Sequence, residues 1–253
     1  MSNAPAVDYA LRIIEFFSQS HTAVGIADIS NALGINKNAV SRVLGALLES
    51  GWIYCFDPAQ KKYAFTVKPF SIVSGSLERS NLQSLAQPYV NHLHEITGDC
   101  TYLGVRHNEN VLYTLHHNSV GDVKINARVG GEYPLHCSAA GKALLAWSPS
   151  EEITAYFAQY ATARTPQTIT SLPDFLCETE RIRKQGYALD LEEFGKGILC
   201  IAAPVFDAER KIVAAVGIST LTIYHTPQSL VEEKMAIVTE TAANISAALG
   251  YTV

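Results

Sequence analysis

Apolar residues recur at helical spacing through the first fifty residues of the chain. In the first segment they occupy positions 6, 10, 11, 14 and 17, where Pro5 suits the opening turn of a helix. A second, short helix is predicted over residues 25–35; it ends at Gly34, a residue at ease in the left-handed C-cap conformation. A third begins after Asn36, whose side chain suits an N-cap, and runs to about Ser50. Three consecutive helices are therefore expected, the last two joined by a tight turn.

The third predicted helix separates apolar from polar side chains. Its apolar residues share one stripe, formed by Val40, Val43, Leu44, Leu47 and Leu48. Another face carries a set that we call the polar ridge: Lys37, Asn38, Ser41 and Arg42. A helix that only fills a core needs no such ridge, so the pattern predicts one packed face and one face offered to an anionic partner. The alternative is a small helical subdomain whose polar face is simply solvated.

The period of the pattern changes after Gly51. Residues 52–66 alternate between apolar and polar positions and break at "DPAQ", which predicts a β-hairpin with Lys61 and Lys62 beside its tip. Three helices followed by a hairpin make a winged helix-turn-helix, expected over residues 1–66.

The rest of the chain predicts a linker helix over residues 67–84 and a second domain over residues 85–253. The expected strands of that domain cover residues 101–107, 111–117, 187–191, 198–206 and 211–219. Its expected helices cover residues 138–147, 149–160, 174–186 and 229–250. The chain is therefore expected to be an α+β protein whose second domain is of comfortable single-core size.

Composition and charge narrow the class of protein. The longest apolar run, "ILCIAAPVF", is far shorter than the roughly 18 residues that span a bilayer, so no membrane association is expected. There is no secretion signal, and the five cysteines are scattered without a Cys-x-x-Cys spacing, which favours reduced thiols in a cytoplasm. The net charge is −5, and residues 1–66 hold five basic against five acidic residues. Any phosphate binding must therefore come from the local placement of a few cations.

One motif invites a nucleotide-binding interpretation, which fails on its spacing. "HCSAAGKALLA" contains Gly-Lys at the start of a helix, but a phosphate loop needs Gly where His136 stands and Ser or Thr where Ala143 stands. A helix start can still hold a small carboxylate or another polar ligand through its free amides.

The other polar clusters do not require catalysis or a metal site. The acidic cluster Asp190, Glu192 and Glu193 could support acid–base chemistry or form a solvated loop. The pairs His92/His94, expected on a helix, and His116/His117, expected on a strand, point apart, so no metal or cofactor is expected. Cys137 and Cys200 lack a base partner in the sequence, and buried, inert thiols are the default for both.

Three stretches together resemble the IclR-type (isocitrate lyase regulator) family of transcription factors over nearly the whole chain. They are "IADISNALGINKNAVSRVLGALLESGWI", "VGGEYPLHCSAAGKALLA" and "RIRKQGYALDLEEFGKGILCIAAPVFD". The first fits the family's helix-turn-helix, and the last two follow its order and spacing. The resemblance implies a winged helix that binds operator DNA, a linker helix, and a GAF-like effector-binding domain. It also implies a dimer, and a dimer of dimers.

The resemblance assigns roles to particular residues. The polar ridge would lie in the major groove, with Lys61 and Lys62 holding phosphates from the wing. A small carboxylate would bind at residues that family members use or that would line the same pocket: Ile125, Ala139, Ala140, Asp190, Ile198, Cys200, Gly217 and Ser219. Relatives that bind small carboxylates carry Ser at the position of Gly217. This departure removes one hydroxyl and opens room, which suggests an organic acid bulkier than glyoxylate or pyruvate.

The sequence therefore predicts a ligand-responsive, DNA-binding transcriptional regulator in the cytoplasm that recognises a palindromic operator and a small organic acid. Two alternatives remain at this stage. One is an enzyme that uses the C-terminal pocket, with the N-terminal part as an assembly domain; the other is a protein-interaction module. The missing nucleophile–base set and the wing lysines argue against the enzyme.

Overall fold

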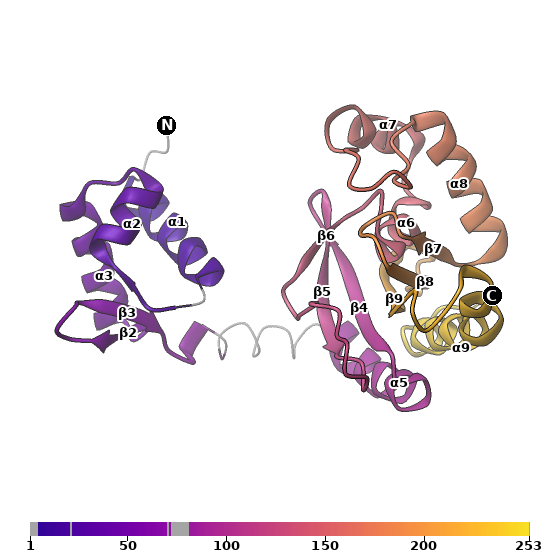
Figure 1. Ribbon diagram of the computed structural model, residues 1–253, viewed down its shortest axis with the longest axis horizontal. Coiled ribbons are helices and arrows are strands. Elements are labelled where there is room, and N and C mark those ends of the chain that lie inside the picture. The colour runs from indigo at the N-terminus through magenta and orange to yellow at the C-terminus, as the bar shows by residue number, and fades with distance from the viewer. Residues whose placement is uncertain (1–4, 21, 70, 72–80, 253) are drawn as a thin grey trace. The chain divides into compact units, whose positions relative to one another are not determined.

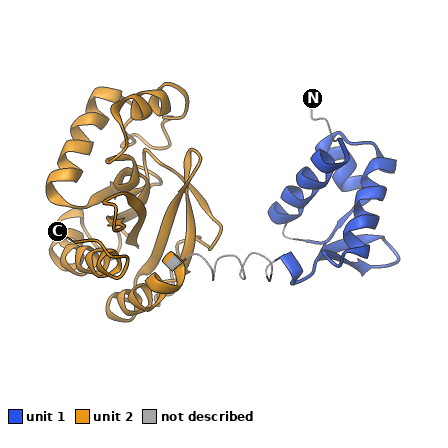
Figure 2. Ribbon diagram, turned by 180° about the vertical axis from the view of Figure 1, so that it is seen from behind, with its two compact units in different colours: residues 1–79 blue, residues 80–253 orange. Residues whose placement is uncertain are grey.

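The chain folds into two compact units, residues 1–79 and 80–253 (Figure 2). The computed structural model describes residues 5–20, 22–69, 71 and 81–252. The linker helix expected over residues 67–84 lies largely outside the described residues. Both units combine runs of helices with runs of antiparallel strands, so the α+β class is confirmed (Figure 1).

Unit 1 opens with the three expected helices, α1 (Pro5–Gln19), α2 (Ile26–Leu33) and α3 (Lys37–Glu49). Gly34 ends α2 in the left-handed conformation, with φ 67°. The Asn36 side chain caps α3 by accepting the Ala39 amide at 2.9 Å, as predicted. The helices bury the predicted stripe of α3 in one core, whose fully or nearly fully buried members include Ile13, Ile29, Val40, Leu44 and Ile53.

The predicted hairpin is present as β2 (Ile53–Asp57) and β3 (Lys62–Phe65). The Asp57 carboxylate accepts the amides of Ala59 and Gln60 and so shapes the turn between the strands. A two-residue strand that the sequence pattern did not predict, β1 (Val24–Gly25), pairs with β3 and gives the order β1-β3-β2. Three helices and this small sheet confirm the winged helix-turn-helix.

Unit 2 is built on a six-stranded antiparallel sheet with the order β6-β5-β4-β9-β8-β7 (Figure 1). Its strands are β4 (Cys100–His107), β5 (Asn110–His117), β6 (Glu132–Pro134), β7 (Ala188–Leu191), β8 (Ile198–Phe206) and β9 (Ile212–Leu221). Five of the six were predicted; β6 was missed, because three residues carry too little periodicity.

Two groups of helices cover opposite faces of this sheet. The helices α5 (Asn81–Thr97) and α9 (Pro227–Ala248) pack on one face, over a core that includes Leu103, Leu115, Ile201 and Ile218. On the other face lie α6 (Ala139–Leu145), α7 (Ser150–Gln159) and α8 (Leu172–Gln185). Successive strand residues point to opposite faces, so the even-numbered positions 200 and 202 of β8 face α6. Nowhere in the described part of the chain is a helix both long and apolar enough to cross a membrane.

Candidate DNA-binding surface and effector site

All four side chains of the polar ridge are exposed on α3, opposite its buried stripe. Within the described residues, none of the four forms an ion pair or a side-chain hydrogen bond. Two of them, Lys37 and Arg42, are cations without an acidic partner. This contrasts with Arg12 on α1, whose guanidinium donates to the Leu33 carbonyl at 2.7 Å and is therefore engaged within the fold. The polar ridge is thus an exposed surface of hydrogen-bond donors, and no acidic side chain of the described residues pairs with its two cations.

The wing places Lys61 and Lys62 where its turn meets β3. Lys61 is exposed and adopts a positive φ of 51°, and Lys62 pairs with Gly25 and Asp57 in the sheet register. Their ammonium groups have no ion-pair partner in the described residues. Both lysines therefore stand at the tip region of the hairpin, as the sequence predicts.

Four residues of the α6-facing side of the sheet form a row across neighbouring strands. Asp190 on β7 is paired with Cys200 on β8, Cys200 with Ser219 on β9, and Ser219 with Cys100 on β4. Directly paired residues point to the same face, and Cys200 Sγ lies 3.0 Å from Ser219 Oγ. The structure thus brings together three residues that the sequence separates by up to 29 positions. We call the four residues Asp190, Cys200, Ser219 and Cys100 the polar row.

Asp190 is the titratable centre of the polar row. One carboxylate oxygen, Oδ1, accepts the amides of Glu193 and Phe194 at 2.7 and 3.2 Å. The other, Oδ2, is buried and has no hydrogen-bond partner in the described structure. Burial, reinforced by the charge of Glu193 and opposed by the two amides and Lys142, raises the pKa of Asp190 to about 7. Near neutral pH this carboxyl can therefore accept or donate a hydrogen bond.

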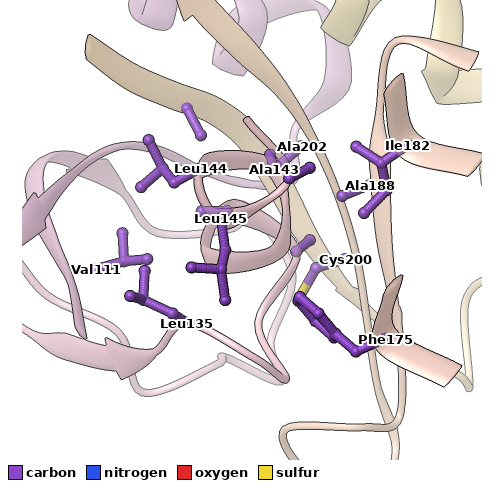
Figure 3. Close-up of a cluster of buried hydrophobic side chains, with 14 of the residues drawn as sticks. Val111, Leu135, Ala143, Leu144, Leu145, Phe175, Ile182, Ala188, Cys200 and Ala202 are labelled. Carbon is purple, nitrogen blue, oxygen red and sulfur yellow. The ribbon is translucent and has the colours of Figure 1, made fainter. Parts of the chain in front are cut away.

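The first turn of α6 packs on the same side of the sheet as the polar row. Ala139 and Ala140 belong to the buried cluster that also contains Cys200, and Figure 3 shows Cys200 together with Ala143 and Leu145 of this helix. The first amides of a helix have no acceptor within it, and the N-cap Ser138 side chain accepts that of Gly141 at 3.2 Å. The α6 start therefore places small side chains and amide donors over the sheet.

The two predicted apolar wall residues lie in different places. Ile125 lines a cavity of about 230 Å³ at the strand ends, together with Ser219, Asp99 and Lys234. Ile198 instead packs, half-buried, against the cluster beneath α6. Ser219 is thus the residue that the cavity shares with the polar row.

The room expected at Gly217 is not there, and this expectation is wrong. A β-carbon at this position would lie 2.7 Å from the Tyr102 hydroxyl and 2.9 Å from Ala202 Cα, and it would also collide with the Ile201 carbonyl oxygen. The space is filled by the phenol of Tyr102 and by close approach of β8. The argument from Gly217 for a bulkier effector therefore fails. No signal in the sequence connects positions 102 and 217; only the pairing of β4 with β9 does.

The acidic cluster is not a solvated loop, which corrects one of the two interpretations given above. Glu193 is buried and its carboxylate pairs with Lys142 of α6, which also contacts Glu178 of α8 at 3.2 Å. Burial raises the pKa of Glu193. Glu178 in turn contacts Arg181 at 2.5 Å. This ion cluster ties α6, α8 and the loop after β7 together and was missed at the sequence level.

The side chains of His94, His116 and His117 pack or form hydrogen bonds within the C-terminal unit. His94 and His117 stack at 5.0 Å between ring centroids, and His116 contacts the Cys100 sulfur at 3.2 Å. Nowhere in the described chain do three or more His, Cys, Asp or Glu side chains gather in a way that could hold a metal. Cys137 and Cys200 are buried, as expected, and burial raises the pKa of the Cys137 thiol to about 12. Burial also raises the pKa of the Cys200 thiol, so both thiols keep their protons at neutral pH.

The winged helix-turn-helix and the separate domain with a buried polar row define a regulator that couples DNA binding to a sensor domain. Residues 6–54 match the model for the "IclR helix-turn-helix domain", and residues 74–247 match that for "Bacterial transcriptional regulator IclR C-terminal". The chain belongs to the IclR family of bacterial transcriptional regulators.

Similar proteins support this assignment along the full chain. The DNA-binding transcriptional repressor YiaJ of Escherichia coli K12 is 32% identical over 96% of this chain and 87% of its own length. The IclR structure from Thermotoga maritima has a TM-score of 0.81 at 27% identity and covers 98% of this chain and 100% of that one. An IclR homologue from Microbacterium hydrocarbonoxydans shares the fold, with a TM-score of 0.85 at 21% identity over 96% and 98% of the two chains.

The family settles the choice between a regulator and an enzyme. Curated relatives are named as transcriptional regulators or repressors, and both family models describe regulator domains. The protein is a DNA-binding transcriptional regulator with a C-terminal effector-binding domain, and the enzyme alternative is not supported.

Proposed function

We propose that this regulator binds a palindromic operator as a dimer in the cytoplasm, with α3 in the major groove of each half-site. The observation that carries the proposal is the exposed polar ridge, whose Lys37 and Arg42 have no acidic partner in the described structure. Arg can form a bidentate contact with guanine, while Asn38, Ser41 and Lys37 are suited to adenine or phosphate contacts. Lys61 and Lys62 then hold the flanking phosphates.

A dimer compensates for the neutral charge of the N-terminal unit. Five basic and five acidic residues within positions 1–66 provide no general attraction to DNA. Two copies double every phosphate and base contact and fix two half-sites about one helical turn, roughly 34–36 Å, apart. A dimer of dimers requires a second interface, and operator binding as proposed requires the dimer alone.

The operator proposal is tested with Arg42→Ala, measured by fluorescence anisotropy on the promoter DNA beside the protein's own gene at physiological salt. Loss of one bidentate contact per half-site costs about 1–3 kcal/mol each, so specific binding falls at least tenfold while the oligomeric state stays the same. Lys184→Ala, which removes an exposed cation of α8, is the matched control and leaves affinity unchanged. If Arg42→Ala binds the operator as tightly as wild type, the polar ridge does not make the proposed base contact.

We further propose that the effector is a small organic acid bound between the first turn of α6 and the polar row. Support comes from the unpartnered Oδ2 of Asp190, the adjacent Cys200 and Ser219, and the amides at Ala139 and Ala140. Ile125 and Ile198 supply apolar surface at its margins. The Microbacterium homologue was solved in complex with 4-hydroxybenzoate, an acid of this class.

This second proposal is tested by calorimetry with glyoxylate, pyruvate and 4-hydroxybenzoate. Asp190→Ala weakens the best-bound acid by about 1.5–3 kcal/mol, the usual size for a hydrogen bond that involves a charged group. Glu240→Ala, an exposed carboxylate of α9, is the control. If Asp190→Ala binds as tightly as wild type, the effector lies elsewhere.

A further inference from the structure

Tyr102 lies flat across the sheet on the side that faces α6. It is paired with Gly217 on the neighbouring strand β9, and its hydroxyl is 2.7 Å from the point where a β-carbon on Gly217 would stand. The same point is 2.9 Å from Ala202 Cα on β8. The phenol therefore passes over β9 toward β8, and the absence of a side chain at position 217 makes this path possible.

The hydroxyl of Tyr102 is buried without a partner. The residue is 0% exposed, and its oxygen has no hydrogen-bond partner in the described structure. The ring of Tyr113 stacks on it at 4.3 Å with an interplanar angle of 8°, and the Tyr113 hydroxyl lies near enough to oppose the rise in the Tyr102 pKa, although the Tyr102 oxygen has no partner in hydrogen-bond geometry. A hydroxyl removed from water without a partner lowers stability. The Tyr102 hydroxyl is therefore suited to form a hydrogen bond with a ligand from outside the chain.

The surroundings of the hydroxyl are those of the proposed effector site. Burial and the neighbouring Cys200, Cys100 and Asp190 raise the pKa of Tyr102 well above its ordinary value, so the phenol stays neutral and keeps its proton to donate. Those three neighbours are members of the polar row. Asp190 also carries an unpartnered oxygen, Oδ2, which accepts a hydrogen bond when ionised. The Tyr102 hydroxyl, a hydrogen-bond donor, and Asp190 Oδ2, an acceptor, thus both lack partners on the same face of the sheet.

A row of aromatic rings joins these two groups along the edge of the site. Tyr102 stacks on Tyr113, Tyr113 meets Tyr133 at 4.3 Å, and Tyr133 meets Phe194 edge-on at 5.5 Å. Phe194 donates its backbone amide to Asp190 Oδ1 at 3.2 Å. The row therefore runs from the unpartnered phenol to the loop that holds the unpartnered carboxylate, and it fixes the position of both.

We propose that the Tyr102 hydroxyl donates a hydrogen bond directly to the bound effector, and that the effector is a small hydroxylated carboxylic acid. The inference rests on the effector site proposed above and adds to it both a residue and a ligand class. The carboxylate of the acid accepts from the neutral phenol, and its hydroxyl donates to Asp190.

The test uses the full-length protein and calorimetry with three matched pairs of acids: lactate and propionate, 4-hydroxybenzoate and benzoate, gluconate and hexanoate. Wild type binds at least one hydroxylated acid more tightly than its partner. Tyr102→Phe keeps the ring stack but weakens that acid at least tenfold. Its thermal midpoint without ligand is equal to or above that of wild type, because an unpartnered buried hydroxyl has been removed.

Tyr156→Phe is the matched control. It also removes a buried hydroxyl from this unit, but one that accepts the Leu135 amide at 3.1 Å and contacts His136 at 3.0 Å. The control lowers the thermal midpoint and leaves the affinity for the acid within twofold. If the Tyr102 hydroxyl had only a structural role, Tyr102→Phe would likewise lower the thermal midpoint and leave the affinity unchanged. Measuring the midpoint and the affinity together therefore separates a role in stability from a role in binding.

Three results would overturn the inference: wild type binds none of the hydroxylated acids, Tyr102→Phe binds as tightly as wild type, or Tyr102→Phe lowers the thermal midpoint as the control does. Its failure differs from failure of the effector site itself. If Asp190→Ala weakens the acid and Tyr102→Phe does not, only the role of Tyr102 is lost. If neither variant weakens it, the proposed effector site is wrong as well.

Discussion

Lys142 on α6 and Glu178 on α8 form an ion pair of 3.2 Å whose side chains are 1% and 6% exposed. Lys142 also pairs with the buried carboxylate of Glu193. One buried ammonium thus pairs with two carboxylates, one of which, Glu178, also contacts Arg181. Removing one member of a buried ion pair leaves charge without compensation, which costs far more than the net value of the pair.

Lys142→Met is therefore expected to lower the free energy of unfolding of the C-terminal unit by about 3–5 kcal/mol. Urea unfolding followed by circular dichroism measures the change. Lys211→Met is the control: Lys211 pairs with Glu209 at 2.7 Å, but the two side chains are 72% and 70% exposed. No measurable change is expected there, and equal effects of the two substitutions would contradict a buried role for Lys142.

Gly217→Ala is expected to destabilise the C-terminal unit by about 1–3 kcal/mol, the usual cost of overpacking a core. The added carbon would press on the Tyr102 hydroxyl and on the backbone of β8, which cannot move without disturbing the sheet. Gly121→Ala is the control, because its new carbon would meet the Tyr224 hydroxyl at an ordinary 3.5 Å. Thermal unfolding of both variants checks the difference; a stable Gly217→Ala protein would show that the site has room after all.

Asp190 is expected to make the protein less stable as the pH rises. Burial raises its pKa from 3.8 to about 7, so between these values the folded protein holds a proton that the unfolded chain has lost. The free energy of unfolding then falls by up to about 1.4 kcal/mol per pH unit in this window and becomes level above it. Asp190→Asn carries no titrating proton and keeps an oxygen for the amides of Glu193 and Phe194.

The measurement is urea unfolding of wild type and Asp190→Asn from pH 5 to pH 8.5. The stability of wild type relative to the variant declines between pH 5 and 7 and then stays constant. Glu240→Gln, on the exposed side of α9, gives no such trend. A relative stability that is flat or rises with pH would mean that the folded-state pKa of Asp190 is not raised.

Replacing both wing lysines, Lys61→Ala with Lys62→Ala, is expected to weaken binding to all DNA sequences about equally. Each lost phosphate contact flattens the dependence of log affinity on log salt concentration by about 0.9. Anisotropy titrations on the promoter fragment and on a scrambled fragment, each at several salt concentrations, provide both slopes. A change in sequence preference without a change in slope would assign base reading to the wing instead.

Local patterns along the chain were sufficient to predict most of the fold. The stripe of α3, the Asn36 cap, the Gly34 C-cap and the hairpin at residues 52–66 depend on residues within a few positions of one another. Periodicity and capping arise from interactions between residues a few positions apart, so a local pattern is enough to predict them. The polar ridge could be predicted for the same reason, because its four residues lie on two consecutive turns of one helix.

The sequence by itself thus determined most of the elements and the class of fold, and it singled out Asp190, Cys200 and Ser219, whereas β1, β6 and the place of Cys100 in the polar row were not predicted. Only the tertiary structure decided what Gly217, Lys142 and Tyr102 do. Strand register places Tyr102 over Gly217, and the packing of α6 on α8 buries Lys142 between two carboxylates. Strand register and helix packing bring residues tens of positions apart into contact. Local periodicity depends only on near neighbours, so it does not predict which distant residues will be in contact.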